Sequence, residues 1–294
     1  MFLPFNYDQP LFRPPSEANS IILQVTLGCS WNKCSFCEMY KTKQFHVKKE
    51  DDILAEILSL KGLIHYPAKI FLADGDAMVL STPKLLKIAD ALHEVITRIN
   101  RISVYALPSN ILSKTDAELK QLYEAGYKLM YVGIESGHDE LLQLVHKGET
   151  RQSTVDAILK ARQAGIKSSV MILTGLGGKS YSDQHAIASA EILNEIQPEY
   201  ASTLVLSFPY GETHYQNQFP AYLPMTTPEL LQELETFIQH LDLKATIFRS
   251  DHASNYLVLK GVLNKDKEAM LQQLHQAIHQ PLDVRLRKEW ERGF

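Results

Sequence analysis

The fold of this chain is organised around one stretch, Cys29-Ser30-Trp31-Asn32-Lys33-Cys34-Ser35-Phe36-Cys37. It contains all three cysteines of the 294 residues and follows a strand-like apolar run over 21–27. Thiolates are soft ligands that favour iron–sulfur clusters or zinc. Three protein ligands would leave one coordination position open in either kind of metal site, and we expect chemistry to occur there.

Outward from this stretch, short apolar runs alternate with amphipathic segments. Few polar residues interrupt the apolar runs, which is typical of parallel strands that helices cover on both faces. These apolar runs predict strands over 21–27, 69–73, 102–106, 129–134, 168–173 and 201–206. Helix starts are predicted near Asp51, at Thr82-Pro83, at the capping box that begins at Thr115, and near Ser153, Ser182 and Thr227. The alternation predicts an α/β fold, a partial or complete (β/α) TIM-type barrel with a mostly parallel sheet.

The length of the chain favours one domain, because single α/β barrels routinely reach 294 residues. We expect an N-terminal extension over 1–20 and a barrel core over 21–241. A C-terminal α/β extension over 242–294 should pack on the barrel without forming an independent domain. In it we expect short strands over 246–248 and 256–259, a helix over 265–279, and a solvated helical tail over 285–292.

Charge and cysteine usage limit the possible partners and compartments. Lysine and arginine total 30 against 34 acids, a net charge of −4, and no long basic run is present, so nucleic acid is not a favoured partner. Three cysteines within nine residues indicate a reducing compartment rather than a disulfide framework. The first twenty residues show no signal pattern, and no apolar run reaches membrane-spanning length. We therefore expect a cytoplasmic protein with no membrane partner.

The cysteine loop resembles the signature of the radical S-adenosylmethionine (SAM) superfamily. That signature follows a first strand, usually has the spacing Cx3CxxC, and places an aromatic residue just before the last cysteine. Here the aromatic residue is Phe36 and the spacing is Cx4CxxC, one residue longer. The resemblance implies one four-iron, four-sulfur cluster on Cys29, Cys34 and Cys37, whose fourth iron is bound by SAM.

Two later segments match family motifs that bind the methionine and ribose parts of SAM. Asp74, Gly75 and Asp76 follow the second strand, where the family holds the methionine amino group; a helix-capping loop is the alternative for this segment. The segment ending in Glu135-Ser136-Gly137 follows the fourth strand. It is similar to one best known from methylthiotransferases, Elongator's catalytic subunit and oxygen-independent coproporphyrinogen oxidase. By that resemblance, Glu135 and Ser136 bind the ribose hydroxyls and the methionine part.

A third segment, at the end of the fifth strand, resembles the glycine-containing strand end that lies against the adenine in this family. Gly175 and Gly177 would allow close approach of the backbone to the base. The sequence around Gly178-Lys179-Ser180 lacks the earlier glycine of a phosphate-binding loop, because Leu173 stands at that position.

The resemblance implies an oxygen-sensitive enzyme that cleaves SAM reductively to methionine and a 5′-deoxyadenosyl radical, which abstracts hydrogen from a substrate. No cysteine remains for a second cluster, which favours isomerisation, decarboxylation, elimination, oxidation or adenosyl addition on a small molecule. The family implies a reducing partner such as flavodoxin or ferredoxin. No residue is singled out as a catalytic hydrogen donor.

Two other classes of function remain open from the residues alone. One is a non-catalytic zinc-binding barrel, in which His46 completes a Cys3His site. The other is an iron–sulfur electron carrier or scaffold.

Overall fold

The computed structural model describes residues 4–209 and 211–293, which divide into two compact units. The first unit contains the described residues up to Asn32, Cys37–Val132 and Asp156–Ser168. The second contains Lys33–Phe36, Gly133–Val155 and the described residues from Ser169 onward. Residues 1–3 of the predicted N-terminal extension and residue 294 of the predicted C-terminal extension lie outside the described residues.

The first unit is built on strands that are parallel and hydrogen-bonded in the order β1, β4, β5, β6. In register, Ile21 lies opposite Ile70, and Val104 opposite Met130. A separate antiparallel ribbon pairs β2 with β3. The strands are β1 (Ile21–Gln24), β2 (Thr26–Leu27), β3 (His46–Val47), β4 (Ala68–Ala73), β5 (Ile99–Tyr105) and the first part of β6 (Tyr127–Glu135).

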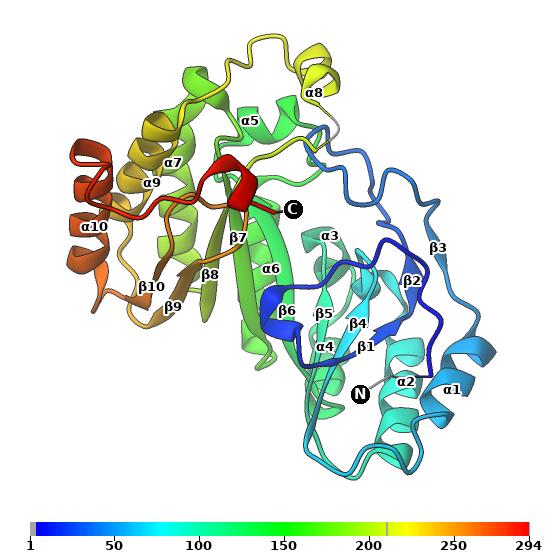
Figure 1. Cartoon of the computed structure of the whole chain (residues 1–294). Helices are drawn as coiled ribbons and strands as arrows, with labels where there is room; N and C mark the ends of the chain where they lie inside the picture. The colour runs from blue at the N-terminus through cyan, green and yellow to red at the C-terminus, as the bar shows by residue number, and fades with distance from the viewer. Residues whose placement is uncertain (1–3, 210, 294) are drawn as a thin grey trace. The chain divides into compact units, whose positions relative to one another are not determined.

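Helices of the first unit pack on these strands around a continuous apolar core. Leu23, Ile70, Leu72 and Val104 are fully buried in it. Figure 1 shows α1 and α2 next to each other, and α2 also contacts α4. The helical segments are η1 (Pro15–Glu17), α1 (Glu50–Leu58), η2 (Ala77–Val79), α2 (Thr82–Val95), α3 (Pro108–Leu112), α4 (Asp116–Glu124) and the second part of α6 (Arg151–Gln163).

In the second unit, β7, β8 and β9 are parallel and β10 is antiparallel to β9. Helix α9 packs between α7 and α10, as Figure 1 shows. The strands are β7 (Lys167–Thr174), β8 (Tyr200–Val205), β9 (Thr246–Ser250) and β10 (Leu259–Leu263). The helical segments are α5 (Asp139–Leu144), α7 (Gly178–Ile196), α8 (Thr213–Gln218), α9 (Thr227–His240), α10 (Lys267–His279) and η3 (Glu289–Glu291).

All six predicted strands are present, although the one predicted over 21–27 is divided into β1 and β2, which belong to different sheets. Most predicted helix starts lie within two residues of the observed ones. Helix α6 begins at Arg151 because Thr150 caps it, its Oγ1 accepting from Ser153 N at 3.0 Å. The predicted start of α7 near Ser182 is wrong by four residues, since the helix begins at Gly178 directly after the strand-end loop.

The C-terminal predictions are less accurate. The predicted strand over 256–259 is observed later, at Leu259–Leu263. The predicted helical tail over 285–292 is wrong, because the segment holds only the short turn Glu289–Glu291. Arg287 instead holds this segment on the loop before β10 by donating to the carbonyls of His252 at 2.6 Å and Asn255 at 3.0 Å. Among the described residues, none of the helices combines the length and apolar character needed to cross a bilayer.

The capping box of α4 gives a direct test of the fold. Thr115 Oγ1 accepts from Glu118 N at 3.2 Å, and Glu118 accepts from Thr115 N at 2.7 Å. Replacement Thr115→Ala removes this cap, so we expect the free energy of unfolding, measured in urea, to fall by about 1 kcal/mol. The exposed Gln121→Ala change in the same helix is the control, and an equal loss in both variants would contradict the prediction.

Candidate functional site

Most of the cysteine loop belongs to the first unit, where the β2–β3 ribbon joins its two ends. Gly28 takes a left-handed φ of 76° just before Cys29, and a Cβ there would lie 3.4 Å from Lys43 Cβ. Asn32 also has a left-handed φ, 44°, and its Nδ2 donates to the Tyr40 carbonyl at 3.0 Å. Asparagine adopts this conformation more readily than most residues. Asn32 therefore suits the left-handed turn that the loop makes between Cys29 and Cys34.

A short piece of the loop that contains Cys34 belongs to the second unit. Ser35 fixes it by donating to the Val145 carbonyl, from N at 3.0 Å and from Oγ at 3.2 Å. Cys34 Sγ lies 4.0 Å from the Lys147 carbonyl. The Phe36 ring packs on an apolar cluster of this unit that includes Leu141, Leu173, Leu176 and Tyr215. The aromatic residue of the motif thus anchors the loop.

The three cysteines are half-buried, and none forms a disulfide. Within 4–209 and 211–293, no three His, Cys, Asp or Glu side chains surround a point where a single metal ion could bind. In a four-iron cluster each cysteine binds a different iron, so the thiols need not converge on one point. His46 of the alternative zinc site is exposed on β3, with Nδ1 3.1 Å from the Gln44 carbonyl. The thiol donors suit an iron–sulfur cluster.

The two acids that follow β4 are completely buried, but they have different partners. Asp74 Oδ2 lies 2.8 Å from Lys43 Nζ, so an ion pair neutralises this carboxylate. Asp76 Oδ2 accepts hydrogen bonds from the Ser30 hydroxyl and from Asn110 Nδ2, the latter at 2.5 Å. Burial raises the pKa of Asp76 to about 6. Its Oδ1 has no side-chain partner among the described residues.

Gly75 lies between these acids where the chain passes close to the cysteine loop. A Cβ at this position would lie 2.6 Å from Tyr40 Cε2 and 3.1 Å from Cys29 Cβ. The shorter of these distances is one that real Cβ atoms essentially never show. Glycine is therefore required here by close packing against the Tyr40 ring, and the contact with Cys29 is also tight.

Glu135, at the end of β6, has a left-handed φ of 66°, which is unusual for a residue with a long side chain. Its carboxylate folds back over Gly133, where a Cβ would lie only 2.1 Å from Glu135 Oε1. Oε1 lies 3.1 Å from the buried Lys147 ammonium. Oε2 is buried and, among the described residues, has no hydrogen-bond partner. A strained backbone and an oxygen without a partner are features expected of a ligand site at this strand end.

Ser136 is fully buried, and its hydroxyl contacts protein groups. Its Oγ lies 2.8 Å from His185 Nδ1 and accepts from His138 N at 3.0 Å. Gly137 packs against α7, where its N donates to Ser189 Oγ at 3.1 Å. A Cβ on Gly137 would lie 2.0 Å from a carbonyl oxygen of that helix. The two residues after Glu135 therefore fix this loop on α7.

Gly175 follows β7 with a left-handed φ of 84°, and its N donates to Glu233 Oε1 at 2.6 Å. A Cβ there would lie 2.7 Å from Leu230 Cδ2, so helix α9 covers this side of the glycine. A Cβ on Gly177 would lie 2.5 Å from Tyr181 Cβ. Both glycines thus have a packing reason to be glycine, in addition to the predicted contact with adenine.

Four buried charged or titratable residues of the site are absent from the motifs: Lys43, Lys147, His185 and Glu233. Burial raises the pKa of Glu233 to about 7 and lowers that of His185 to about 4, and His185 Nε2 lies 3.7 Å from Glu233 Oε1. No sequence signal identifies them, because each contacts a residue between 12 and 58 positions away along the chain. Only Lys43, six residues after Cys37, lies near a motif in the sequence.

The raised pKa of Glu233 predicts a pH dependence of stability. The folded protein keeps this carboxyl protonated between its ordinary pKa of 4.5 and about 7, so its contribution to stability is lost as pH rises through that window. Replacement Glu233→Gln removes the ionisation and retains an acceptor for Gly175 N. Relative to wild type, we expect the variant to gain up to about 3 kcal/mol in free energy of unfolding between pH 4.5 and pH 8.

Urea unfolding of both proteins across this range is the measurement. The Glu235→Gln change on the same helix is the control, and its difference from wild type should stay within about 0.5 kcal/mol. A difference for Glu233→Gln that does not change with pH would contradict the assignment.

Comparison with known proteins supplies the family. A protein from Methanocaldococcus jannaschii named as a methylthiotransferase is 26% identical over 175 residues, covering 55% of this chain and 38% of its own length. The heme chaperone HemW of Bacillus subtilis is 26% identical over 123 residues, covering 41% and 32% respectively. The chain thus spans less than two fifths of the length of these relatives.

A solved structure and a family model agree with these relatives. The coproporphyrinogen III oxidase HemN from Escherichia coli has the same fold over 75% of this chain and 52% of its own, with a TM-score of 0.57 and 17% identity. A model described as the radical SAM superfamily matches residues 23–190, more than half of the chain. These matches confirm the predicted family and the α/β fold class, and a 4Fe-4S cluster and SAM are the cofactors of that family. The chain belongs to the radical SAM superfamily.

Proposed function

We propose that this chain cleaves SAM reductively at a single 4Fe-4S cluster and uses the product to abstract hydrogen from a small-molecule substrate. One observation carries the proposal: three half-buried thiols, none in a disulfide, occupy one loop after the first parallel strand, and the chain has no fourth cysteine. A site with three cysteine ligands leaves one iron open to a further ligand.

In this proposal Cys29, Cys34 and Cys37 hold the cluster. The loop residues beside them fix the thiols: Asn32 sets the turn through its left-handed backbone, and Phe36 anchors the second part of the loop by packing. When bound, the cluster and SAM supply a 5′-deoxyadenosyl radical for hydrogen abstraction. The task of the chain is to bind and orient these groups and to exclude water.

Among the residues around SAM, Asp76 and Glu135 are the best candidates for direct contact. Asp76 accepts from neutral hydroxyl and amide groups and has no ion-pair partner among the described residues, so an ammonium group can supply the missing counter-charge. Glu135 Oε2, which is buried and has no partner in the described part of the chain, can accept from a ribose hydroxyl. The hydroxyl of Ser136 is engaged by His185, so this residue positions the loop.

Gly75, Gly175 and Gly177 complete the proposed site by close packing. Gly75 allows the acidic segment to approach Cys29, and the other two let the end of β7 turn closely against its neighbours. A side chain at any of these positions would displace the backbone that the proposal places against the cofactors.

The substrate and the reductant are proposed by chemical class. A flavodoxin or ferredoxin would deliver the electron that the cluster needs. The relative named as a methylthiotransferase suggests sulfur transfer as another reaction, but the three cysteines of this chain leave none for a second cluster. We therefore favour a reaction that needs hydrogen abstraction alone.

The proposal is tested by a product assay. After anaerobic reconstitution, the wild-type protein should bind about four irons per chain and release 5′-deoxyadenosine when given SAM and dithionite. Replacement Cys34→Ala should abolish both, whereas a protein that holds the cluster without forming the product would be an electron carrier or scaffold. A colourless protein that retains one zinc per chain would contradict the proposal.

The role of Glu135 is tested by Glu135→Gln. Removing this charged acceptor should weaken SAM binding by about ten- to hundredfold, because hydrogen bonds to charged groups contribute most. The iron content should not change. Equilibrium dialysis with labelled SAM measures the affinity. The exposed Glu195→Gln change serves as the control, and unchanged affinity in Glu135→Gln would contradict the role.

A further inference from the structure

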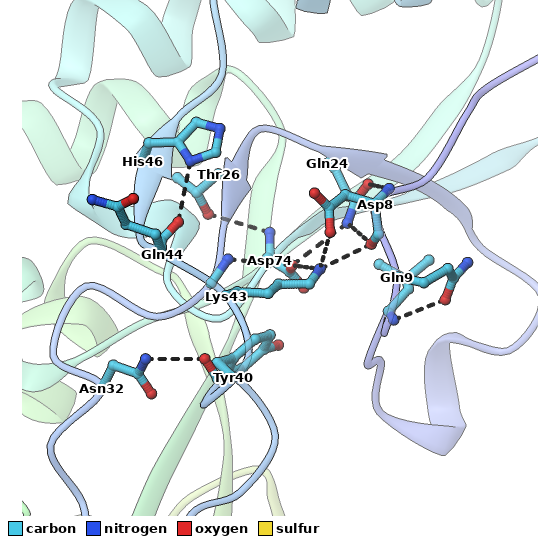
Figure 2. Close-up of polar contacts among 12 residues, drawn as sticks. Asp8, Gln9, Gln24, Thr26, Asn32, Tyr40, Lys43, Gln44, His46 and Asp74 are labelled. Atoms are coloured by element: carbon cyan, nitrogen blue, oxygen red, sulfur yellow. Dashed lines mark hydrogen bonds and ion pairs between the residues drawn. The ribbon is translucent and has the colours of Figure 1, made fainter.

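Lys43 is a buried lysine whose ammonium group contacts three acceptors. Its side chain is only 5% exposed, and Nζ lies 2.8 Å from Asp74 Oδ2, 2.8 Å from the Asp8 carbonyl and 3.2 Å from Asp8 Oδ1. Burying an ammonium group costs free energy unless it is paired and hydrogen-bonded. The arrangement in Figure 2 satisfies this condition, with Lys43 lying between Asp74 and Asp8.

Asp74 contacts the cysteine loop at both of its ends. Its Oδ2 accepts from Gly28 N at 3.4 Å, directly before the first cysteine, and pairs with Lys43, which follows the last cysteine by six residues. The backbone N of Asp74 donates to Thr26, to the carbonyl at 3.1 Å and to Oγ1 at 3.2 Å. Both ends of the cysteine loop are therefore bonded to the same residue, Asp74.

The same carboxylate also fastens the N-terminal segment. Gln24 Nε2 donates to the Asp8 carbonyl at 2.9 Å and lies 3.5 Å from Asp74 Oδ2, and Asp8 N donates to Gln24 Oε1 at 2.9 Å. Figure 2 shows these groups converging beside the end of the loop. Because all of these contacts lie within the first unit, the network is a local feature of it.

We propose that Asp74 and Lys43 form a clasp that holds the cysteine loop closed in the metal-free protein, so that Asp74 is a positioning residue for the cluster ligands. This inference rests on the proposed function in one respect, because the loop must bind a cluster for Asp74 to position the cluster ligands. In the clasp the Asp74 carboxylate accepts from Gly28 N while Lys43 balances its charge. A loop fixed at both ends loses less conformational freedom when its thiols bind iron.

A double-mutant cycle of Lys43 and Asp74, followed by amide hydrogen exchange, tests the clasp. Removing one partner leaves the other charge buried and unpaired, whereas removing both leaves a neutral pair. In the metal-free protein, Lys43→Met and Asp74→Asn should each raise amide hydrogen-exchange rates over residues 28–45 by about tenfold or more. The double variant should exchange more slowly than either single variant. Asp8→Asn, which changes a half-exposed partner, should give a smaller increase.

The matched control is Lys48→Met, which breaks the partly exposed ion pair between Lys48 and Glu56 in the same unit. This change should leave exchange over 28–45 as in wild type, and helix α4 provides an internal reference in every variant. Loop exchange in Lys43→Met and Asp74→Asn equal to that of wild type would overturn the clasp. If a single variant fails to fold, the Asp8→Asn and double variants decide by the same comparison.

A second measurement separates the clasp from direct binding of SAM by Asp74. After reconstitution, Asp74→Asn should lower the iron content per chain, while the loaded fraction binds SAM within about threefold of wild type. Full iron content with SAM affinity reduced about tenfold or more would identify Asp74 as a SAM ligand instead. If the wild type bound no cluster, the proposed function would fail, but hydrogen exchange of the metal-free protein would still decide the clasp.

Discussion

Each unit buries a carboxylate at the end of a strand and pairs it with a lysine from a loop. In the first unit the pair is Asp74 with Lys43, and in the second it is Glu135 with Lys147. A buried carboxylate without such a partner would take up a proton or force the strand end towards water. The lysines thus allow charged groups to remain where parallel strands end, which is where ligands bind in this class of fold.

The two pairs differ in what the paired oxygen of the acid contacts besides its lysine. Lys43 brings Asp74 into contact with both ends of the cysteine loop, so that carboxylate is used within the protein. Lys147 engages only one oxygen of Glu135, and the other oxygen is buried with no partner in the described residues. Asp74 Oδ1 is likewise buried with no hydrogen-bond partner in the described residues, so each acid is held through one oxygen and can accept a hydrogen bond through the other.

The strands and the cysteine loop could be predicted from the sequence because their signals are local. Apolar runs locate all six predicted strands, the capping box at Thr115 locates α4, and Thr227-Pro228 locates α9. The wrong start of α7 has a physical cause: no N-cap side chain marks it, and the helix follows a glycine turn. The tail over 285–292 has the composition of a helix, but hydrogen bonds from Arg287 to distant carbonyls hold it in another conformation.

The candidate site could be predicted only where residues fall inside a motif. The motifs predict that Asp74, Asp76 and Ser136 belong to the SAM site. Their hydrogen-bond and ion-pair partners decide whether each side chain remains available to a ligand. Those partners, such as Lys43 and His185, come from other segments and leave no pattern in the sequence. The turn within the cysteine loop is a similar case, since the left-handed backbone of Asn32 that forms it leaves no pattern in the sequence.

Electron paramagnetic resonance of the reduced, reconstituted protein, recorded with and without SAM, tests the central claim most directly. If three cysteines hold a 4Fe-4S cluster with one open iron, the reduced protein should give a cluster signal, and SAM should shift its g-values by binding that iron. A cluster signal that SAM leaves unchanged, or the absence of any cluster signal after careful anaerobic reconstitution, would contradict the account.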